Sequence, residues 1–172
     1  SVLIFCGRGN NGGDGAAIAR ILAMRGGRVR IVLLVEIEST TGDARTNFEI
    51  VRQIADGVPE IQTPQGVILD LKRIEDSRGS LKLNICESAD KLYESISPPL
   101  ATSADVIIDA IFGTGLTRPV SGVFEAAITF INSVRQGSEE RRDCPLIVSV
   151  DVPSGLNSDL AEPIGPAVYA DM

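Results

Sequence analysis

Three short apolar runs of this chain each lead into a polar loop that contains glycine, and this repeated pattern constrains the fold more than any other feature. The apolar runs cover 2–6, 106–108 and 146–150, and the loops that follow cover 6–15, 109–115 and 151–155. Unbroken apolar runs are typical of parallel strands that are covered on both faces. Because the carboxyl ends of parallel strands meet at one edge of a sheet, we expect the three loops to line a single pocket.

The rest of the chain predicts helices between these strands. Apolar residues recur at helical spacing in 17–24, 43–56 and 122–136. Strands are expected at 2–6, 28–35, 105–111 and 145–150. Strands that alternate with helices imply right-handed crossovers, so the pattern predicts an α/β fold with a mainly parallel sheet.

Length and composition predict one soluble domain over 1–172. The chain has 172 residues, 44% of them hydrophobic, and no apolar run approaches the ~20 residues of a membrane span. It starts at Ser1 inside a strand-like run and stops at Met172, so we expect a piece of a longer polypeptide, truncated at both ends.

The segment 58–103 is the least regular part of the chain. It contains strand-like pieces at 67–71 and 81–85, a helical pattern at 89–96 and the breaker Pro98-Pro99. We interpret this segment as a third strand plus an atypical insertion within the domain.

Composition excludes several classes of chemistry. The chain has no histidine, which removes Ser-His-Asp triads, Cys-His dyads and imidazole acid/base catalysis, so carboxylates must carry any proton transfer. Its three lysines lie in the middle segment and not in the glycine loops. The loops therefore lack the lysine that a Walker-type phosphate site or a Schiff-base enzyme needs. A formal charge of −7 argues against a nucleic-acid partner. Three widely spaced cysteines are typical of buried thiols in a reducing compartment.

The first loop satisfies the G-x-G-x-x-G dinucleotide fingerprint over 7–12, between a predicted strand and a predicted helix. Asp14 at the expected helix start would oppose a phosphate in the usual position, and Glu36 or Glu38 could serve a ribose. Alternatively, the glycines only allow a tight turn and Asp14 caps the helix. Asn10 and Asn11 could bind a neutral polar ligand or a hard cation.

Asp109 lies near the end of an apolar strand, where an unpaired carboxylate would be costly to bury. Its partner could be a metal ion or an arginine, or it could accept hydrogen bonds from backbone amides of a neighbouring loop. The following residues, 113–119, supply amides, hydroxyls and Arg118, which could cradle an anion or form an ordinary loop.

Asp151 ends the last strand, and Pro153-Ser154-Gly155 predicts a turn that aims Ser154 toward the pocket rim. A partly buried aspartate in a pocket is the best group in this chain to exchange a proton near neutral pH. The alternative is a turn-forming cluster that bonds only its own backbone.

Together the three motifs resemble the NAD(P)H-hydrate epimerases, the YjeF N-terminal domain family. The residues that carry the resemblance are Gly9-Asn-Asn-Gly-Gly-Asp-Gly15, Asp109-Ala-Ile-Phe-Gly-Thr-Gly-Leu116, Arg118-Pro-Val-Ser-Gly122 and Val150-Asp-Val-Pro-Ser-Gly-Leu156. The resemblance implies a Rossmann-like three-layer αβα sandwich, a homodimer, and epimerisation of the R and S forms of hydrated NADH and NADPH at C6. It also implies a dehydratase as functional partner, sometimes fused in the parent chain. Thiol usage and the bacterial-type match imply a cytoplasmic protein.

Carried over by position, the resemblance implies Asp151 and Asp14 as catalytic residues and a potassium site on Asn11, Asp109 and Ser154. The substrate-binding residues that it implies are Asn10, Asn11, Gly12, Gly13, Asp14, Gly113, Thr114, Gly115, Leu116, Thr117, Arg118, Pro119 and Asp151. Arg8 departs from the family pattern, which has proline there, and could touch a phosphate or only water.

Two other functions compete with the epimerase interpretation. One is a catalytically silent member of the same fold that acts as a binding or scaffold module, like family members in messenger-RNA decapping. The other is a nicotinamide dehydrogenase, which Asp14 and the paired asparagines disfavour.

Overall fold

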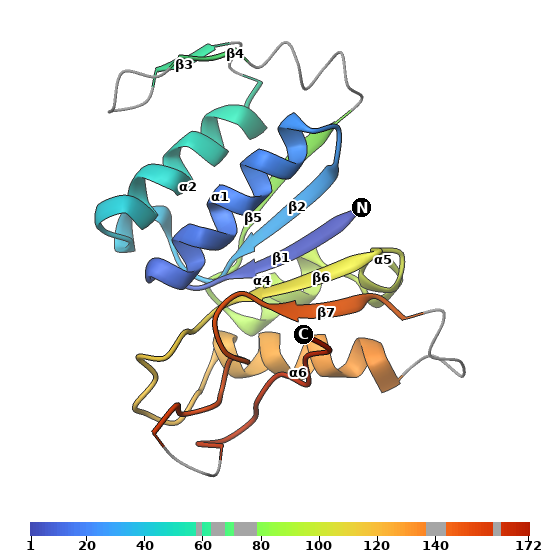
Figure 1. The fold of residues 1–172 in the computed structure, drawn as a ribbon. Helices are drawn as coiled ribbons and strands as arrows, with labels where there is room; N and C mark the ends of the chain where they lie inside the picture. Colours follow the sequence, from blue (N-terminus) through green and yellow to red (C-terminus); the bar gives the residue numbers. More distant parts are fainter. Residues whose placement is uncertain (58–59, 63–67, 71–78, 137–143, 160–162) are drawn as a thin grey trace.

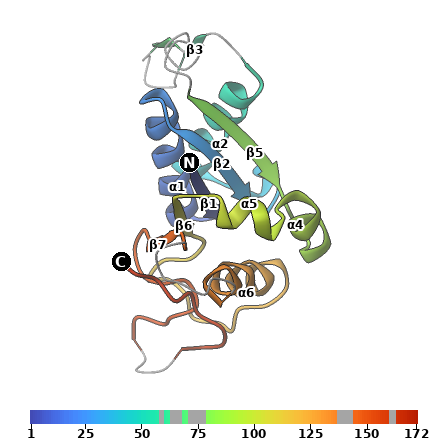
Figure 2. The same cartoon turned by 90° about the vertical axis from the view of Figure 1, so that its right-hand side faces the viewer.

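A computed structural model of the chain shows a five-stranded sheet between two layers of helices (Figure 1, Figure 2). It describes residues 1–57, 60–62, 68–70, 79–136, 144–159 and 163–172. The strands are all parallel and are arranged in the order β5-β2-β1-β6-β7. Their bounds are β1 Val2–Cys6, β2 Arg28–Leu33, β5 Ser80–Ile85, β6 Val106–Ala110 and β7 Leu146–Ser149.

The strand order places a topological switch point between β1 and β6. From β1 the chain moves outward through β2 to β5, and then returns to the other side of β1 to form β6 and β7. The loops that follow β1 and β6 therefore lead to helices on opposite faces of the sheet (Figure 1). Open α/β sheets bind ligands in the crevice that such a reversal creates.

Helices cover both faces of the sheet, so the predicted three-layer α/β fold is confirmed. One layer holds α1 Asn10–Met24 and α2 Gly42–Ala55, and the short helix η1 Ile37–Ser39 precedes α2. The other layer holds α4 Ala89–Ser95, α5 Pro98–Thr102 and α6 Val123–Gln136 (Figure 2). None of the helices in the described ranges is long and apolar enough to serve as a membrane span.

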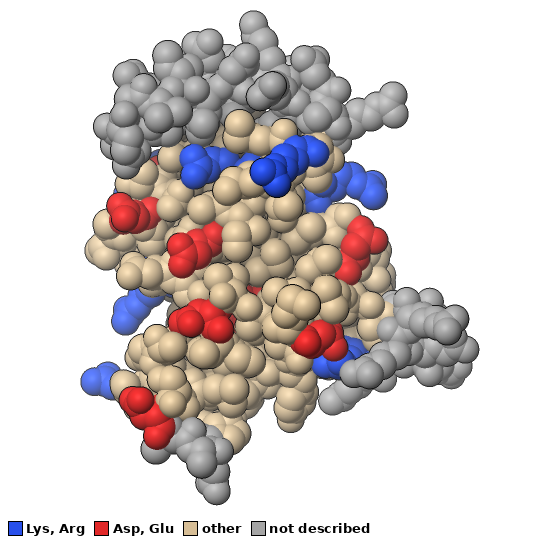
Figure 3. Space-filling view, viewed as in Figure 1, with Lys and Arg blue, Asp and Glu red and all other residues tan. Residues whose placement is uncertain are grey.

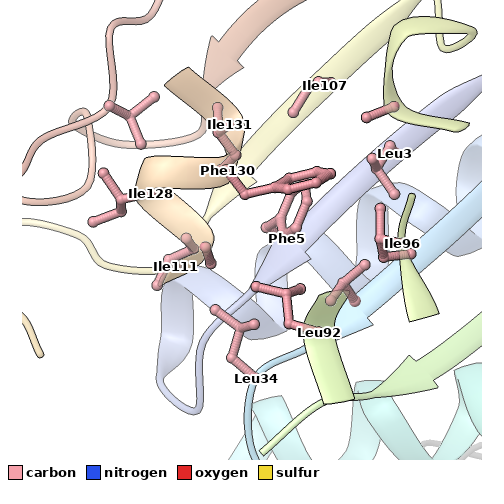
Figure 4. Packing of buried hydrophobic residues seen from close by; sticks show 14 of the residues in the cluster. Leu3, Phe5, Leu34, Leu92, Ile96, Ile107, Ile111, Ile128, Phe130 and Ile131 are labelled. Atoms are coloured by element: carbon pink, nitrogen blue, oxygen red, sulfur yellow. The ribbon is translucent and has the colours of Figure 1, made fainter. Parts of the chain in front are cut away.

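Each layer packs an apolar helix face on the sheet. Side chains alternate between the two faces of a strand, and β1 is apolar on both. Its Ile4 and Cys6 face α1 and α2, whereas its Leu3 and Phe5 face the opposite layer. In that second layer the rings of Phe5 and Phe130 lie 6.0 Å apart and tilted (Figure 4). The sheet is thus buried on both sides, as the unbroken apolar runs predict.

The start of α1 differs from the expectation. The sequence predicts a helix over 17–24, but α1 begins at Asn10, inside the glycine loop, with Gly9 as its N-cap. Glycines are poor helix formers, so the first turn carries no helical signal in the sequence. Asp14 is consequently the fifth residue of the helix, and its interpretation as a helix cap is wrong.

The segment 58–103 contributes directly to the main fold. Its strand β5 pairs with β2 at one edge of the sheet, and α4 and α5 bury Leu92 and Ala101 in the core. A separate antiparallel pair consists of β3 Glu60–Gln62 and β4 Ile68–Asp70. The Pro98-Pro99 pair begins α5 instead of breaking the chain, because proline is tolerated in the first helical turn. The remaining predictions for 58–59, 63–67 and 71–78 lie outside the described residues.

Candidate active site

A pocket of about 1030 Å³ opens at the carboxyl edge of the sheet, at the switch point between β1 and β6. All three glycine-containing loops contribute to it, as the sequence predicts. The residues that line it are Arg8, Gly9, Asn10, Asn11, Asp14, Ile111, Phe112, Gly113, Thr114, Gly115, Leu116, Thr117, Arg118, Val150 and Asp151.

Most of the predicted substrate-binding residues line this pocket. Gly12 and Gly13 do not, because they are buried in α1 beneath it, and Pro119 lies outside the lining. A Cβ atom at Gly12 would stand 1.9 Å from the carbonyl oxygen of Gly7, and one at Gly13 would stand 2.8 Å from the Cα atom of Ala44. These glycines therefore bring α1 close to its neighbours and shape the pocket from below.

Asp109 is fully buried at the end of β6 and accepts four hydrogen bonds. Its Oδ1 accepts from the Ser154 hydroxyl (2.5 Å) and the Ile111 amide (3.2 Å), and its Oδ2 from the Ser154 amide (2.8 Å) and the Ser149 hydroxyl (2.9 Å). Burial raises the pKa of Asp109, and these hydrogen bonds act in the opposite direction. Of the alternatives for its partner, the structure shows backbone amides, one from its own loop and one from the loop after β7, together with two hydroxyls.

The sequence interpretation did not include Ser149, although a signal for it was present. Ser149 is the polar residue of β7, and the β6–β7 register places it directly beside Asp109. A hydroxyl in an otherwise apolar strand next to one that carries a buried carboxylate marks a hydrogen-bond partner.

Ser154 lies beneath the pocket rim, and the expectation that it points toward the rim is wrong. The residue is fully buried, and its hydroxyl donates to Asp109 and accepts from the Phe112 amide (2.9 Å). Its role in this structure is to link the third loop to the second.

Asn11 joins the first loop to the backbone of the same residue, Phe112. Its Nδ2 donates to the carbonyl oxygen of Phe112 (2.8 Å), whereas its Oδ1 is buried and accepts no hydrogen bond from the described residues. The backbone groups of Phe112 thus lie between Asn11 and Ser154. Sequence inspection identified Asn11, Asp109 and Ser154 but not Phe112, since Phe112 contributes through the backbone N–H and C=O that almost every residue has.

This cluster fits a hard monovalent cation. Its oxygens come from Asn11, Phe112, Ser154 and the single carboxylate of Asp109, and an unpartnered buried oxygen such as Asn11 Oδ1 needs a donor or a cation. The four hydrogen bonds fill the lone-pair directions of Asp109, so a cation that binds its carboxylate directly must displace one of them. Among the described residues, no group of three or more His, Cys, Asp or Glu side chains that could hold a metal ion is found, so a cation here would be held mainly by neutral oxygens.

Asp151 is exposed at the pocket surface, so the expectation of a partly buried carboxylate is wrong. Its Oδ2 accepts a hydrogen bond from the Thr114 amide (2.9 Å), which fixes the carboxylate against the second loop. Gly113 makes room for this contact, because a Cβ atom there would stand 2.5 Å from the same oxygen. The pocket therefore presents a positioned carboxylate that solvent and a ligand can both reach.

The acidic residues after β2 lie outside the pocket. Glu38 is near Arg45 (3.8 Å) and Arg52 (3.6 Å), and the pKa of Glu36 is raised by a hydrogen bond with Glu87. Neither Glu36 nor Glu38 lines the pocket, so the ribose contact expected of a nicotinamide dehydrogenase is missing from its described lining.

Comparison with known proteins agrees with the geometry of these loops. A family model described as YjeF-related protein N-terminus matches residues 1–172. The chain belongs to this family. One curated relative, the bifunctional NAD(P)H-hydrate repair enzyme Nnr of Moorella thermoacetica, is 36% identical over 169 residues, which are 98% of this chain and 25% of the relative.

Shorter relatives carry a single activity in their names. The NAD(P)H-hydrate epimerase of Levilactobacillus brevis is 34% identical over 99% of this chain and 58% of the relative, and that of Anaerococcus prevotii is 34% identical over 100% and 62%. The chain therefore spans about a quarter to three-fifths of the curated relatives that it matches. The crystal structure of yeast ynu0 shares the fold, with a TM-score of 0.60 and 22% identity over 98% of this chain and 54% of that one.

Proposed function

We propose that this YjeF-family domain interconverts the R and S epimers of hydrated NADH and NADPH at C6 of the nicotinamide ring, and so acts in cofactor repair. The observation that carries the proposal is the meeting of all three motif loops in one pocket, with carboxylates of Asp14 and Asp151 on its surface. The names of the relatives, NAD(P)H-hydrate epimerase among them, support it.

Asp151 is the proton carrier in this proposal. Epimerisation opens the ring hemiaminal: the C6 hydroxyl loses its proton, the N1–C6 bond breaks with its electron pair moving to nitrogen, and C6 becomes an aldehyde carbon. Asp151 takes the proton from oxygen and delivers it to nitrogen, and the reverse transfers follow when N1 attacks the opposite face. The hydrogen bond from the Thr114 amide holds the carboxylate in place for these transfers.

Asp14 and Asn10 orient the ring and its ribose. Both are exposed on the first turns of α1 and line the pocket. Their side chains can accept and donate hydrogen bonds to the carboxamide and hydroxyl groups of the substrate. Positioning of this kind lowers the barrier by fixing the reacting atoms near the catalytic carboxylate.

A potassium ion would be held by Asn11, Asp109 and Ser154, with the carbonyl oxygen of Phe112 among its neighbours. When bound, it would supply a fixed positive charge beneath the pocket that stabilises negative charge developing on the substrate oxygen. The unpartnered Asn11 Oδ1 supports this assignment.

A homodimer, a cytoplasmic location and cooperation with a dehydratase complete the proposal. The name "bifunctional repair enzyme" of the longer relatives supports the link to a second activity.

One assay separates this function from its competitors. The protein is mixed with a racemic pool of hydrated NADH and a dehydratase that uses only the S form. An epimerase drives complete recovery of reduced cofactor, a silent scaffold leaves the R half behind, and a dehydrogenase requires a second substrate.

A further inference from the structure

Among the residues that the structure describes, the charged side chains that line the pocket are two arginines and two aspartates. Arg8 stands on the loop that follows β1, Arg118 on the loop that follows β6, and Asp14 and Asp151 are the carboxylates. Under the proposed function, Asp14 and Asp151 serve the uncharged nicotinamide end of the substrate. The arginines have no role at that end, so their charge is available to the anionic part of the molecule.

Arg8 is exposed and makes no hydrogen bond or ion pair with the described residues. Its backbone is nevertheless fixed by its neighbours. The Gly7 amide donates to the Ala110 carbonyl (3.1 Å), and the Gly13 amide donates to the Gly9 carbonyl (3.0 Å). A long cationic side chain on a fixed backbone at the pocket mouth is positioned to meet a ligand without loop rearrangement.

The position also favours an anion electrostatically. Arg8 lies immediately before α1, whose N-terminus carries partial positive charge and whose N-cap Gly9 offers no side-chain acceptor to the first amides. The whole chain carries a formal charge of −7, and on the face shown in Figure 3 separate acidic groups are spread over the described surface. A dinucleotide that carries at least two negative charges therefore needs local cations to approach this pocket.

We propose that Arg8 is a substrate-binding residue that binds a phosphate group of the dinucleotide substrate from the β1 side of the pocket. Its guanidinium presents a planar fork of donors that matches phosphate oxygens. The phosphate is either the pyrophosphate, which both hydrates share, or the 2′-phosphate, which only the NADPH form has. This inference rests on the proposed function.

The test compares Arg8→Gln, Arg8→Lys and the control Arg25→Gln, using hydrated NADH and hydrated NADPH as separate substrates. Arg25 is an exposed arginine at the opposite end of α1 and does not line the pocket. We expect Arg8→Gln to raise KM roughly tenfold, the size of one charge-assisted hydrogen bond, with an unchanged thermal midpoint. The KM of Arg8→Lys should lie between those of the original chain and Arg8→Gln. The KM of Arg8→Gln should also depend less on salt concentration than the KM of the original chain.

The pattern of loss identifies the phosphate. An equal rise of KM for both substrates assigns Arg8 to the pyrophosphate, and a rise confined to hydrated NADPH assigns it to the 2′-phosphate. If Arg8→Gln matches Arg25→Gln with both substrates, the inference is overturned.

Equilibrium binding of ADP-ribose and its 2′-phosphate, measured by calorimetry, separates this result from failure of the proposed function. If the original chain shows no epimerase activity, weaker binding of either probe to Arg8→Gln would still support the phosphate site, while the proposed reaction would be ruled out. Unchanged binding of both probes would remove the role of Arg8.

Discussion

Gly12 and Gly113 show how single residues shape the pocket in different ways. A side chain at Gly12 would meet the backbone oxygen of Gly7, which cannot move without distorting the loop that follows β1. A side chain at Gly113 would overlap the carboxylate of Asp151, which is the end of an exposed side chain and can shift without moving the backbone. The first glycine therefore allows close packing of the loop, and the second allows the placement of the carboxylate that we propose as the proton carrier.

We predict that Gly12→Ala mainly lowers stability, whereas Gly113→Ala mainly lowers activity. Gly12→Ala should lower the free energy of unfolding by about 2–3 kcal/mol, because it forces a backbone overlap. Gly113→Ala should change it by less than about 1 kcal/mol but lower kcat roughly 100-fold, because it displaces Asp151. Denaturant unfolding and the coupled dehydratase assay measure the two effects. Full activity of Gly113→Ala would contradict the assigned role of Asp151.

A second prediction at this scale concerns Asn11. Potassium that binds the folded chain and not the unfolded one should raise the thermal midpoint in a concentration-dependent way. Asn11→Leu keeps the approximate shape but removes the unpartnered Oδ1, so its midpoint should not respond to potassium. Scanning calorimetry in potassium and tetramethylammonium chloride at equal ionic strength provides the comparison. An equal rise for both proteins would place the ion elsewhere.

At the scale of elements, the register between β6 and β7 creates the buried polar cluster. Asp109 pairs with Ser149 across the two strands, and the loop after β7 brings Ser154 over the same carboxylate. A slip of one residue would turn Asp109 to the other face of the sheet and leave a buried charge without partners. The polar cluster thus helps to specify the strand register.

We predict that Ser149→Ala lowers the free energy of unfolding by about 1.5–3 kcal/mol, because it removes a hydrogen bond to a buried carboxylate. Ser133→Ala is the matched control, since Ser133 is exposed on α6 and donates only to the carbonyl oxygen of Phe130. Urea unfolding of both variants gives the difference. Equal stability of the two would mean that Asp109 does not depend on Ser149.

The sequence predicts elements and their order well where apolar periodicity is strong. It predicts them less well where close packing or hydrogen bonds of the backbone determine the structure. The run 2–6 coincides with β1 because an unbroken apolar strand has few alternatives. The first turn of α1 escaped prediction, since its glycines serve close packing and not helix propensity. The contribution of Phe112 through its backbone N–H and C=O carries no sequence signal at all.

At the scale of the whole molecule, the strand order determines where chemistry can occur. Reversal of the strand order between β1 and β6 brings residues about 100 positions apart in the sequence, such as Asn11 and Phe112, into direct contact. Cys6 and Cys86 are buried in the two apolar clusters on opposite sides of the sheet, and burial raises the pKa of both thiols, with the charge of Asp109 adding to the effect on Cys6. These thiols are therefore structural residues of the interior.

We predict that a small thiol reagent labels half-buried Cys144 in the folded chain and reaches Cys6 and Cys86 only after unfolding. Raising the pH from about 7 to 9 ionises an ordinary thiol and speeds its labelling. Because the pKa values of Cys6 and Cys86 lie above their usual range, the same change should leave both unlabelled. Mass spectrometry of digested samples identifies the labelled residues. Rapid native labelling of Cys6 would contradict the packing of α1 on the sheet.

The most direct test of the proposed function follows the conversion of pure R hydrate of NADH to the S form by chromatography, without any dehydratase. The original chain should accelerate this exchange well above its spontaneous rate, and Asp151→Asn should slow it by about 100-fold or more, because the variant has no carboxylate to carry the proton. Exchange that Asp151→Asn leaves undiminished, or an original chain that leaves the spontaneous rate unchanged, would contradict the account.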